Sequence, residues 1–200
     1  MLHEFINWTL EIVGTWGYAG IFILMALEST VLPIPSELVL IPAGYLAYKG
    51  EMSFGLILLT STLGSLAGAS LNYAFALWVG RPFLERYGKY FFVRPELLHK
   101  TDKFFRIHGA ISTFTGRLIP GIRHLIPLPA GLTRMHFTTF SFYTCLGAGL
   151  WSLVLMLIGY FMGGNEVLVK ENLPLLTASV IALVATILGG YYWLKSRRMA

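Results

Sequence analysis

Residues 28–37 read Glu-Ser-Thr-Val-Leu-Pro-Ile-Pro-Ser-Glu and lie in the middle of an apolar region. Proline interrupts a helix because it lacks an N–H group and clashes with the preceding turn. Pro33 and Pro35 therefore cut the region into Tyr18–Leu32 and Glu37–Tyr48. Each half is shorter than the roughly 20 residues that a membrane-spanning helix needs. Non-helical backbone at membrane depth is tolerated only inside protein or beside a wet cavity. We predict a re-entrant hairpin, in which two short helices enter the membrane and leave it on the same side.

The same pattern returns later in the chain. Two short apolar segments, Ala110–Ile119 and His124–Leu132, are separated by Pro120 and Gly121, and the second segment also contains Pro127 and Pro129. The helix-breaking residues again fall where an uninterrupted helix would otherwise span the membrane. This region predicts a second re-entrant hairpin.

The composition places both hairpins in a membrane protein. Apolar residues make up 56% of the chain and charged residues only 12%, whereas a soluble domain is about a quarter charged. A transmembrane β-barrel is excluded because its strands alternate every second residue, and the apolar stretches here do not. Three stretches are long enough to span on their own, namely Ser53–Val79, Phe137–Met162 and Leu173–Leu194. The predicted class is an all-α polytopic membrane protein.

The two hairpins resemble copies of one unit. A shift of 87 residues superposes Pro33 on Pro120, and the segment 42–44 on 129–131, both of which read Pro-Ala-Gly. A shift of 83 residues then superposes Phe54 on Phe137 in the spanning helices that follow. If a hairpin makes no net crossing and its helix makes one, the second copy is inverted relative to the first, as in many transporters.

This repeat divides a single membrane domain, residues 1–200, into consecutive segments. These are an N-terminal interfacial helix (1–17), a first repeat (18–80) with its hairpin (18–48), a basic amphipathic cytoplasmic linker (81–108), a second repeat (109–163) with its hairpin (109–132), and an extra C-terminal transmembrane helix (173–194).

The net charge of +5 predicts an orientation rather than a nucleic-acid partner. Eleven Lys and Arg residues lie in the linker, at Arg134 and in the tail after residue 194, whereas the opposite face holds only Lys49 and Lys170. Basic residues accumulate on the cytoplasmic side of membrane proteins. We therefore expect the linker and the C-terminus to be cytoplasmic.

Four ionisable residues fall in or beside the broken segments: Glu28 and Glu37 in the first, and Arg117 and Arg123 in the second. A charge at the bilayer centre costs at least about 2.5–3.5 kcal/mol, so such residues line a cavity or pair with one another. They form the candidate site. A purely structural alternative stays open, in which the carboxylates only neutralise the arginines and hold the hairpins together.

The two kinds of charge suggest different tasks. Arginine presents a fixed fork of donors that matches phosphate oxygens and stays protonated, and helix ends at the breaks add amide donors for an anion. A partly buried glutamate can exchange a proton near neutral pH. We predict that Arg117 and Arg123 bind an anion and that Glu28 and Glu37 couple protons. His124 is either a proton relay or a polar filler.

No second kind of site is predicted. Cys145 is the only cysteine, and no His/Cys cluster has metal-binding spacing, so no metal or cofactor is expected. No catalytic residue is assigned, since Ser29, Ser36 and Thr115 lack a convincing base, and a hydrolase is the weakest of the functions considered. Two further functions stay open, namely a small-ion exchanger and a structural protein that recruits partners through its basic linker.

The motifs carry a resemblance to a known family. Four segments are similar to those of the DedA family of bacterial inner-membrane proteins. They are residues 28–37, the Pro-Ala-Gly at 42–44, the Gly-Arg-Pro at 80–82, and the pattern from Phe114 through Arg117, Pro120, Arg123 and Pro127 to Gly131. This family shares the VTT domain with eukaryotic lipid scramblases. The resemblance implies a multi-pass protein of the bacterial cytoplasmic membrane that transports lipid and is not an enzyme.

The same resemblance implies particular substrates and roles. It implies movement of undecaprenyl phosphate driven by the proton motive force, with phosphatidylethanolamine or general phospholipid scrambling as the alternative. Proton-coupled small-ion transport stays open as a second alternative, which rests on the broken helices and the glutamate pair. Glu28 and Glu37 occupy the family's acidic positions, and Arg117 and Arg123 its essential arginines. One departure is the Gly-Ala at 68–69, where many members have Gly-Asp. Assembly as a homo-oligomer stays open.

Overall fold

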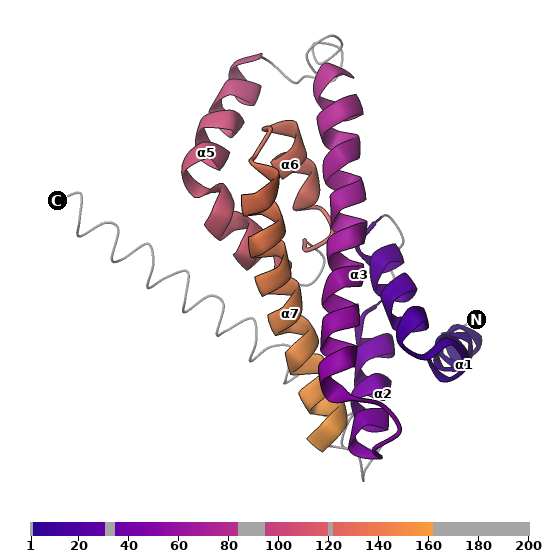
Figure 1. Ribbon diagram of the computed structural model, residues 1–200. Helices are drawn as coiled ribbons and strands as arrows, with labels where there is room; N and C mark the ends of the chain where they lie inside the picture. The colour runs from indigo at the N-terminus through magenta and orange to yellow at the C-terminus, as the bar shows by residue number, and fades with distance from the viewer. Residues whose placement is uncertain (1, 31–34, 84–94, 120–121, 162–200) are drawn as a thin grey trace, which may run out of the picture.

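The computed structural model describes residues 2–30, 35–83, 95–119 and 122–161, and every regular element within these ranges is helical (Figure 1). The prediction of a helical membrane protein is confirmed at this level. The predicted C-terminal helix 173–194 and three of the helix-breaking residues, Pro33, Pro120 and Gly121, lie outside the described residues.

Two long helices form the axis of the molecule. Helix α3 spans Phe54–Phe75 and continues through the π-helical turn η1 (Ala76–Gly80) as one rod of 30 residues to Phe83. Helix α7 spans Phe137–Phe161 and packs alongside α3 (Figure 1). Both are long and apolar enough to cross a membrane.

The first helix, α1 (Leu2–Glu28), changes direction at Gly17, whose φ of 54° and ψ of −127° are not helical. Glycine adopts positive φ without the steric penalty of a Cβ atom. The second part of α1 packs on α3 and ends at Glu28, and α2 (Glu37–Tyr48) then packs on α7.

The second half of the chain contributes α5 (Pro95–Arg117) and α6 (Pro127–Leu132). Here α5 packs on α7 and α6 packs on α3. In Figure 1, α2 lies beside the lower half of the two long helices and α6 beside the upper half, so the two broken regions approach the middle of the molecule from opposite ends.

Two element boundaries differ from those drawn on the sequence. Helix α5 runs unbroken from Pro95 to Arg117, so a boundary between residues 108 and 109 falls inside a helix. The physical reason is that no proline follows Pro95 within this stretch to interrupt the helix. Similarly, the helix of the first half continues beyond Gly80 to Phe83.

Close helix packing depends on glycine in α2 and in α6, the helices that follow the two breaks. A Cβ atom added at Gly44 in α2 would collide with the backbone carbonyl of Met156 in α7. A Cβ atom added at Gly131 in α6 would collide with the carbonyl of Tyr73 in α3. Small residues allow such backbone contact between helices in membranes, where apolar side chains gain little by leaving lipid.

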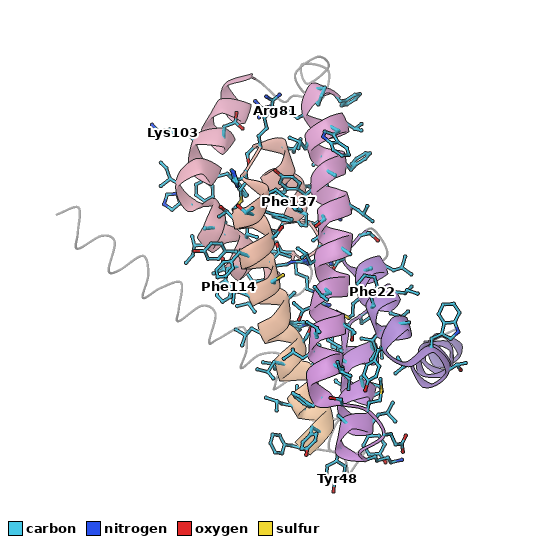
Figure 2. All side chains as sticks on the ribbon, in the orientation of Figure 1. Phe22, Tyr48, Arg81, Lys103, Phe114 and Phe137 are labelled. Atoms are coloured by element: carbon cyan, nitrogen blue, oxygen red, sulfur yellow. The ribbon has the colours of Figure 1, made fainter. Side chains whose placement is uncertain are left out.

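Large apolar side chains cover the outer faces of the rods. Among them Leu71 on α3 is 64% exposed, Trp78 in η1 is 74% exposed and Phe161 on α7 is 78% exposed. Figure 2 shows Tyr48 at one end of the molecule and Arg81 and Lys103 at the other, with apolar side chains between. Such surfaces suit lipid rather than water.

Candidate functional site

Arg123 lies where the two broken regions meet, and it pairs with carboxylates from the first of them. Its Nη2 atom lies 2.6 Å from Glu28 Oε1 and 4.0 Å from Glu37 Oε2. The side chains of Arg123 and Glu28 are 9% and 4% exposed, whereas that of Glu37 is 20% exposed. The structure therefore brings three of the four predicted charged residues together.

Arg117 is the fourth, and it is held in a different way. Its Nη2 donates to the backbone carbonyl of Ser65 (3.1 Å), and its Nη1 donates to the carbonyl of Arg123 (3.3 Å) and lies 3.5 Å from Ser29 Oγ. Within the described residues Arg117 forms no ion pair with either carboxylate. The ion pairs of Arg123 agree with the structural alternative, in which the carboxylates neutralise the arginines, whereas the contacts of Arg117 are with backbone carbonyl groups and a hydroxyl.

Neither arginine uses all of its donors. The Nε atoms of Arg117 and Arg123 are both buried and have no hydrogen-bond acceptor among the described residues. Burying a polar group without a partner costs about 1–3 kcal/mol, so such groups in a native structure call for an explanation. Two buried N–H donors are therefore available to an acceptor.

The charged residues sit at helix ends because the breaks are there. Glu28 is the last residue of α1, Glu37 the first of α2, and Arg117 the last of α5. A negative charge at a helix N-terminus and a positive charge at a C-terminus complement the helix dipole, which favours Glu37 and Arg117 as placed. Arg123 follows in the turn before α6, where its N–H bonds to Ile119 O at 3.2 Å.

The proline residues of the second hairpin differ in role. Pro127 is buried at the first position of α6, where its missing N–H costs nothing and its fixed φ suits a helix start. Pro129 lies within the same helix, and Pro35 is exposed just before α2.

His124 contributes its backbone carbonyl, 3.5 Å from Asn72 Nδ2, and its role as a proton relay stays a prediction.

Asn72 on α3 is a site residue that the sequence did not single out. Its amide nitrogen lies 3.1 Å from Ser29 O, 2.9 Å from Thr30 O and 3.5 Å from His124 O. Carbonyl groups released at a helix break need donors, because lipid supplies none. One amide thus secures both breaks to α3. The signal in the sequence was a carboxamide amid an apolar span.

Trp151 on α7 lies against Arg123 and contacts the start of α2. Its indole N–H donates to Ser36 Oγ at 3.2 Å, and its ring lies 5.2 Å from Arg123 Cζ. A guanidinium over an aromatic ring gains a favourable cation–π interaction, which is stronger where water is excluded. Trp151 therefore holds the start of α2 and covers Arg123 at the same time.

The cavity between these groups is small. Its volume is about 10 Å³, and its polar lining comes from Glu28, Ser65, Arg117, Arg123 and Ser152, with the Trp151 ring as one wall. Such a space holds about one water molecule. The structure is therefore a closed form at the two arginines, with room between them for no more than a water molecule.

Replacing Asn72 with alanine is expected to lower the stability of the folded protein by about 1–3 kcal/mol, because carbonyl groups at both breaks lose their donor. The midpoint of thermal unfolding in detergent measures this. The matched control is Ser70→Ala on the same helix, since Ser70 Oγ bonds only to Leu66 O within α3 among the described contacts. Equal stability of the two variants would show that Asn72 does not hold the breaks.

The fold and the site define a class of protein. Two broken helical regions meet inside a helical membrane protein at buried arginine and glutamate residues, an arrangement that suits binding of a charged substrate. Residues 34–161 match the VTT domain. The chain belongs to this family, which is the family of the DedA proteins that its motifs resemble.

Relatives extend over most of the chain. The uncharacterized membrane protein YkoX of Bacillus subtilis (strain 168) is 39% identical over 82% of the chain and 72% of its own length. Undecaprenyl phosphate transporter A of the same organism is 30% identical over 98% of the chain and 96% of its own length. An alkaline phosphatase-like protein of Lactococcus lactis subsp. cremoris (strain MG1363) is 31% identical over 94% and 91%. No solved structure matches the chain.

Proposed function

We propose that this protein carries a lipid phosphate, most directly undecaprenyl phosphate, across the bacterial cytoplasmic membrane in a proton-coupled cycle. The observation that carries the proposal is the pair of buried Nε–H donors on Arg117 and Arg123 that have no acceptor among the described residues. A phosphate group offers several strong acceptor oxygens for such donors. A relative that matches nearly the whole chain is named undecaprenyl phosphate transporter A.

The proposal includes two inverted repeats, each a re-entrant hairpin followed by a spanning helix. Their packing supports this. Gly44 meets the carbonyl of Met156, and Gly131 meets the carbonyl of Tyr73. The shift of 87 residues relates the two glycines and the shift of 83 relates Tyr73 to Met156. Equivalent residues of the two halves therefore make equivalent contacts, with each second arm on the other half's long helix.

Charge asymmetry sets the proposed orientation. Arg81 and Lys103 lie at one end of the molecule and Tyr48 at the other (Figure 2). Basic loops stay in the cytoplasm, so the end with Arg81 faces the cytoplasm in a multi-pass arrangement with a cytoplasmic C-terminus.

Opposite sides are expected for reporters fused after Gly50 and after Lys89. The first reporter reads as extracytoplasmic and the second as cytoplasmic, because one spanning helix, α3, lies between them. Alkaline phosphatase and fluorescent-protein fusions measure the two locations. A result in which both fusions report the same side would refute the crossing by α3.

The proposed coupling follows from competition for Arg123. Glu28 holds Arg123 at 2.6 Å in the closed form, so an entering phosphate must displace this carboxylate. A buried carboxylate that loses its partner costs several kcal/mol if it stays charged. Taking up a proton removes that cost, and the site then exchanges one anion for another. Glu37, at 4.0 Å and more exposed, is placed to pass the proton toward water.

A hydrolytic enzyme is the weaker candidate function. Ser29 Oγ donates to Glu28 Oε2 at 3.1 Å, which places a hydroxyl beside a carboxylate. The same carboxyl group is already engaged by Arg123, and a carboxylate held by a guanidinium is a poor base. Release of inorganic phosphate from the lipid distinguishes hydrolysis from transport.

The deciding experiment uses pure protein in liposomes. Labelled undecaprenyl phosphate in one arm and labelled phosphatidylethanolamine in the other are followed across the bilayer, with and without a pH gradient. We expect faster movement of undecaprenyl phosphate, further accelerated by the gradient. Equal rates for both lipids would favour a general scramblase, and a proton flux that needs no lipid would favour a small-ion transporter.

A further inference from the structure

A second and much larger cavity lies at the end of the molecule that carries Arg81. Its volume is about 450 Å³, within the range of about 300–1,000 Å³ that is usual for small-molecule sites. It opens where the last turn of the α3 rod, the middle of α5 and the start of α7 come together. These are the ends of the two spanning helices, so the cavity lies near the level of a membrane surface.

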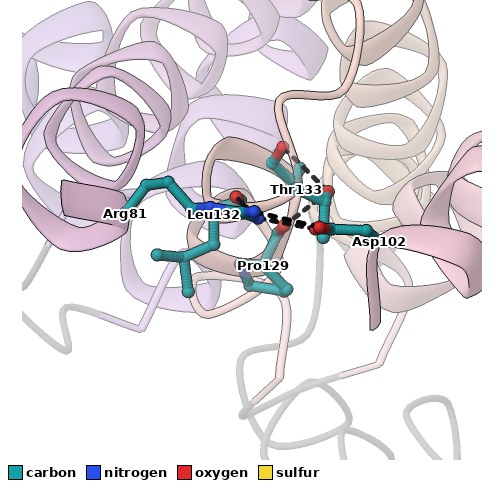
Figure 3. A network of polar contacts seen from close by, with 6 residues as sticks. Arg81, Asp102, Pro129, Leu132 and Thr133 are labelled. Carbon is teal, nitrogen blue, oxygen red and sulfur yellow. Dashed lines mark hydrogen bonds and ion pairs between the residues drawn. The ribbon is translucent and has the colours of Figure 1, made fainter. Parts of the chain in front are cut away.

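One arginine in its wall is fully engaged. Arg81 forms a two-pronged ion pair with Asp102, with Nη1–Oδ1 and Nη2–Oδ2 distances of 2.7 and 3.0 Å, and Nη1 also donates to Leu132 O at 2.8 Å (Figure 3). The pair is electrically neutral as a unit. Its role is therefore to join the end of the α3 rod to α5 and to the end of α6 around the cavity rather than to attract a ligand.

Arg134 is the second arginine, and it is exposed in the wall of the same cavity. No ion pair or hydrogen bond of its side chain occurs within the described residues. The neighbouring charged or titratable groups in the lining are the Arg81–Asp102 pair and His136, whose Nδ1 lies 2.7 Å from Thr138 Oγ1. The lining thus carries a net positive charge that Arg134 supplies.

The backbone at Arg134 is unusual for arginine. The φ angle of Arg134 is 54°. Its backbone N–H donates to the carbonyl of Gly131, and the backbone N–H of Met135 donates to the carbonyl of Ala130, both at 3.0 Å. This is the Schellman ending of a helix, where glycine or asparagine is preferred. Helix α2 ends in the same way with glycine at the corresponding position, Gly50 (φ 77°). Arginine costs stability there, which indicates that its guanidinium has a use.

We propose that this cavity binds the phosphate of a membrane lipid headgroup through Arg134. This inference rests on the proposed function, because it adds a surface site at which the lipid phosphate binds before it reaches Arg117 and Arg123. A lipid is favoured over free phosphate because Phe105, Ile107 and Met135 form an apolar part of the same lining. An amphipathic ligand contacts both parts at once, whereas a free anion contacts only the cationic part.

The test replaces Arg134 with asparagine, which tolerates the left-handed backbone and removes the charge. Lys103→Gln is the matched control, since Lys103 is an exposed cation of α5 outside the lining. Binding of a short-chain polyprenyl phosphate in detergent is measured by calorimetry. Each substitution is made in two backgrounds, the otherwise native protein and the double variant Glu28→Gln/Arg123→Gln, which disables the central site. Arg134→Asn is expected to weaken binding about tenfold in both backgrounds. Lys103→Gln is expected to leave it unchanged.

Several outcomes overturn the inference. Unchanged binding after Arg134→Asn in the background without the central site excludes the cavity. If inorganic phosphate binds as tightly as the polyprenyl phosphate, the site is not a lipid site. If an uncharged polyprenol binds as tightly as the polyprenyl phosphate, the site does not recognise phosphate. Transport in liposomes separates this inference from the proposed function. If the lipid binds at Arg134 but is not transported, only the proposed function fails. If the Arg134→Asn variant binds and transports the lipid as well as the native protein does, only the surface site is refuted.

Discussion

Transport of labelled undecaprenyl phosphate is expected to fall by about 100-fold when Arg123 is replaced by glutamine. Arg123 lies at the meeting point of both hairpins, with Glu28 at 2.6 Å, the Trp151 ring at 5.2 Å and a buried Nε without an acceptor among the described residues. Removing one member of a buried charge-paired contact costs about 2–5 kcal/mol, and each 1.4 kcal/mol is a factor of ten. The initial rate of lipid movement in liposomes measures this effect.

A folded control is needed because Arg123→Gln also leaves Glu28 buried without its partner. The variant Glu28→Gln/Arg123→Gln removes both charges together, and such exchanges are much better tolerated than loss of one charge. We expect the double variant to keep a cooperative unfolding transition and to remain inactive. Arg123→Lys keeps the charge but loses the planar fork, so an intermediate rate is expected. Normal transport by the glutamine variant would exclude Arg123 from the substrate site.

Loss of the response to a pH gradient is the expected result of Glu28→Gln. Glutamine imitates the protonated carboxyl group, so the anion exchange at Arg123 no longer requires a proton. The variant is expected to bind the lipid phosphate and to equilibrate it across the bilayer, while acceleration by the gradient disappears. Glu37→Gln is expected to show a partial loss, because Glu37 lies farther from Arg123 and is more exposed.

The matched control for the glutamate variants is Glu51→Gln. Glu51 is 57% exposed and, among the residues that the structure describes, forms only a surface pair with Lys49 at 3.9 Å, so its removal should change neither rate nor coupling. If Glu28→Gln and Glu37→Gln both keep the full response to the gradient, the protons travel elsewhere, and His124 is the next residue to test. If Glu28→Gln cannot bind the lipid phosphate, the carboxyl group is structural.

The helical class and the long helices could be predicted from local properties of the sequence. Proline placement marks where α1 and α2 are separated, and uninterrupted apolar length marks α3 and α7. The same logic placed Glu28 and Arg123 beside the breaks. Charged residues in such regions line a cavity or pair with one another, so the sequence predicted the place of these residues but left their partners open.

The contacts of Arg117, Asn72 and Trp151 could not be predicted in the same way. Each depends on which helix packs against which, and on backbone carbonyl groups that carry no signal in the sequence. Arg117 bonds to the carbonyl of Ser65 across the bundle. Nothing local distinguishes a carbonyl that accepts such a bond from its neighbours in the same helix. The extension of α5 through residue 108 was missed because a change of composition, rather than a helix breaker, had set that boundary.

The exchange of hairpin arms between the two long helices has a consequence for biosynthesis. Helix α2 packs on α7, yet the ribosome completes α2 at Tyr48 well before it begins α7 at Phe137. At roughly 5–20 residues per second, this interval lasts about 5–20 seconds. During that time a short apolar helix has been inserted without its permanent neighbour. Until then α2 can pack on α1 and α3, but the face that α7 will cover is left to lipid or to the insertion machinery, so nascent chains halted before Phe137 should be preferred substrates of membrane proteases.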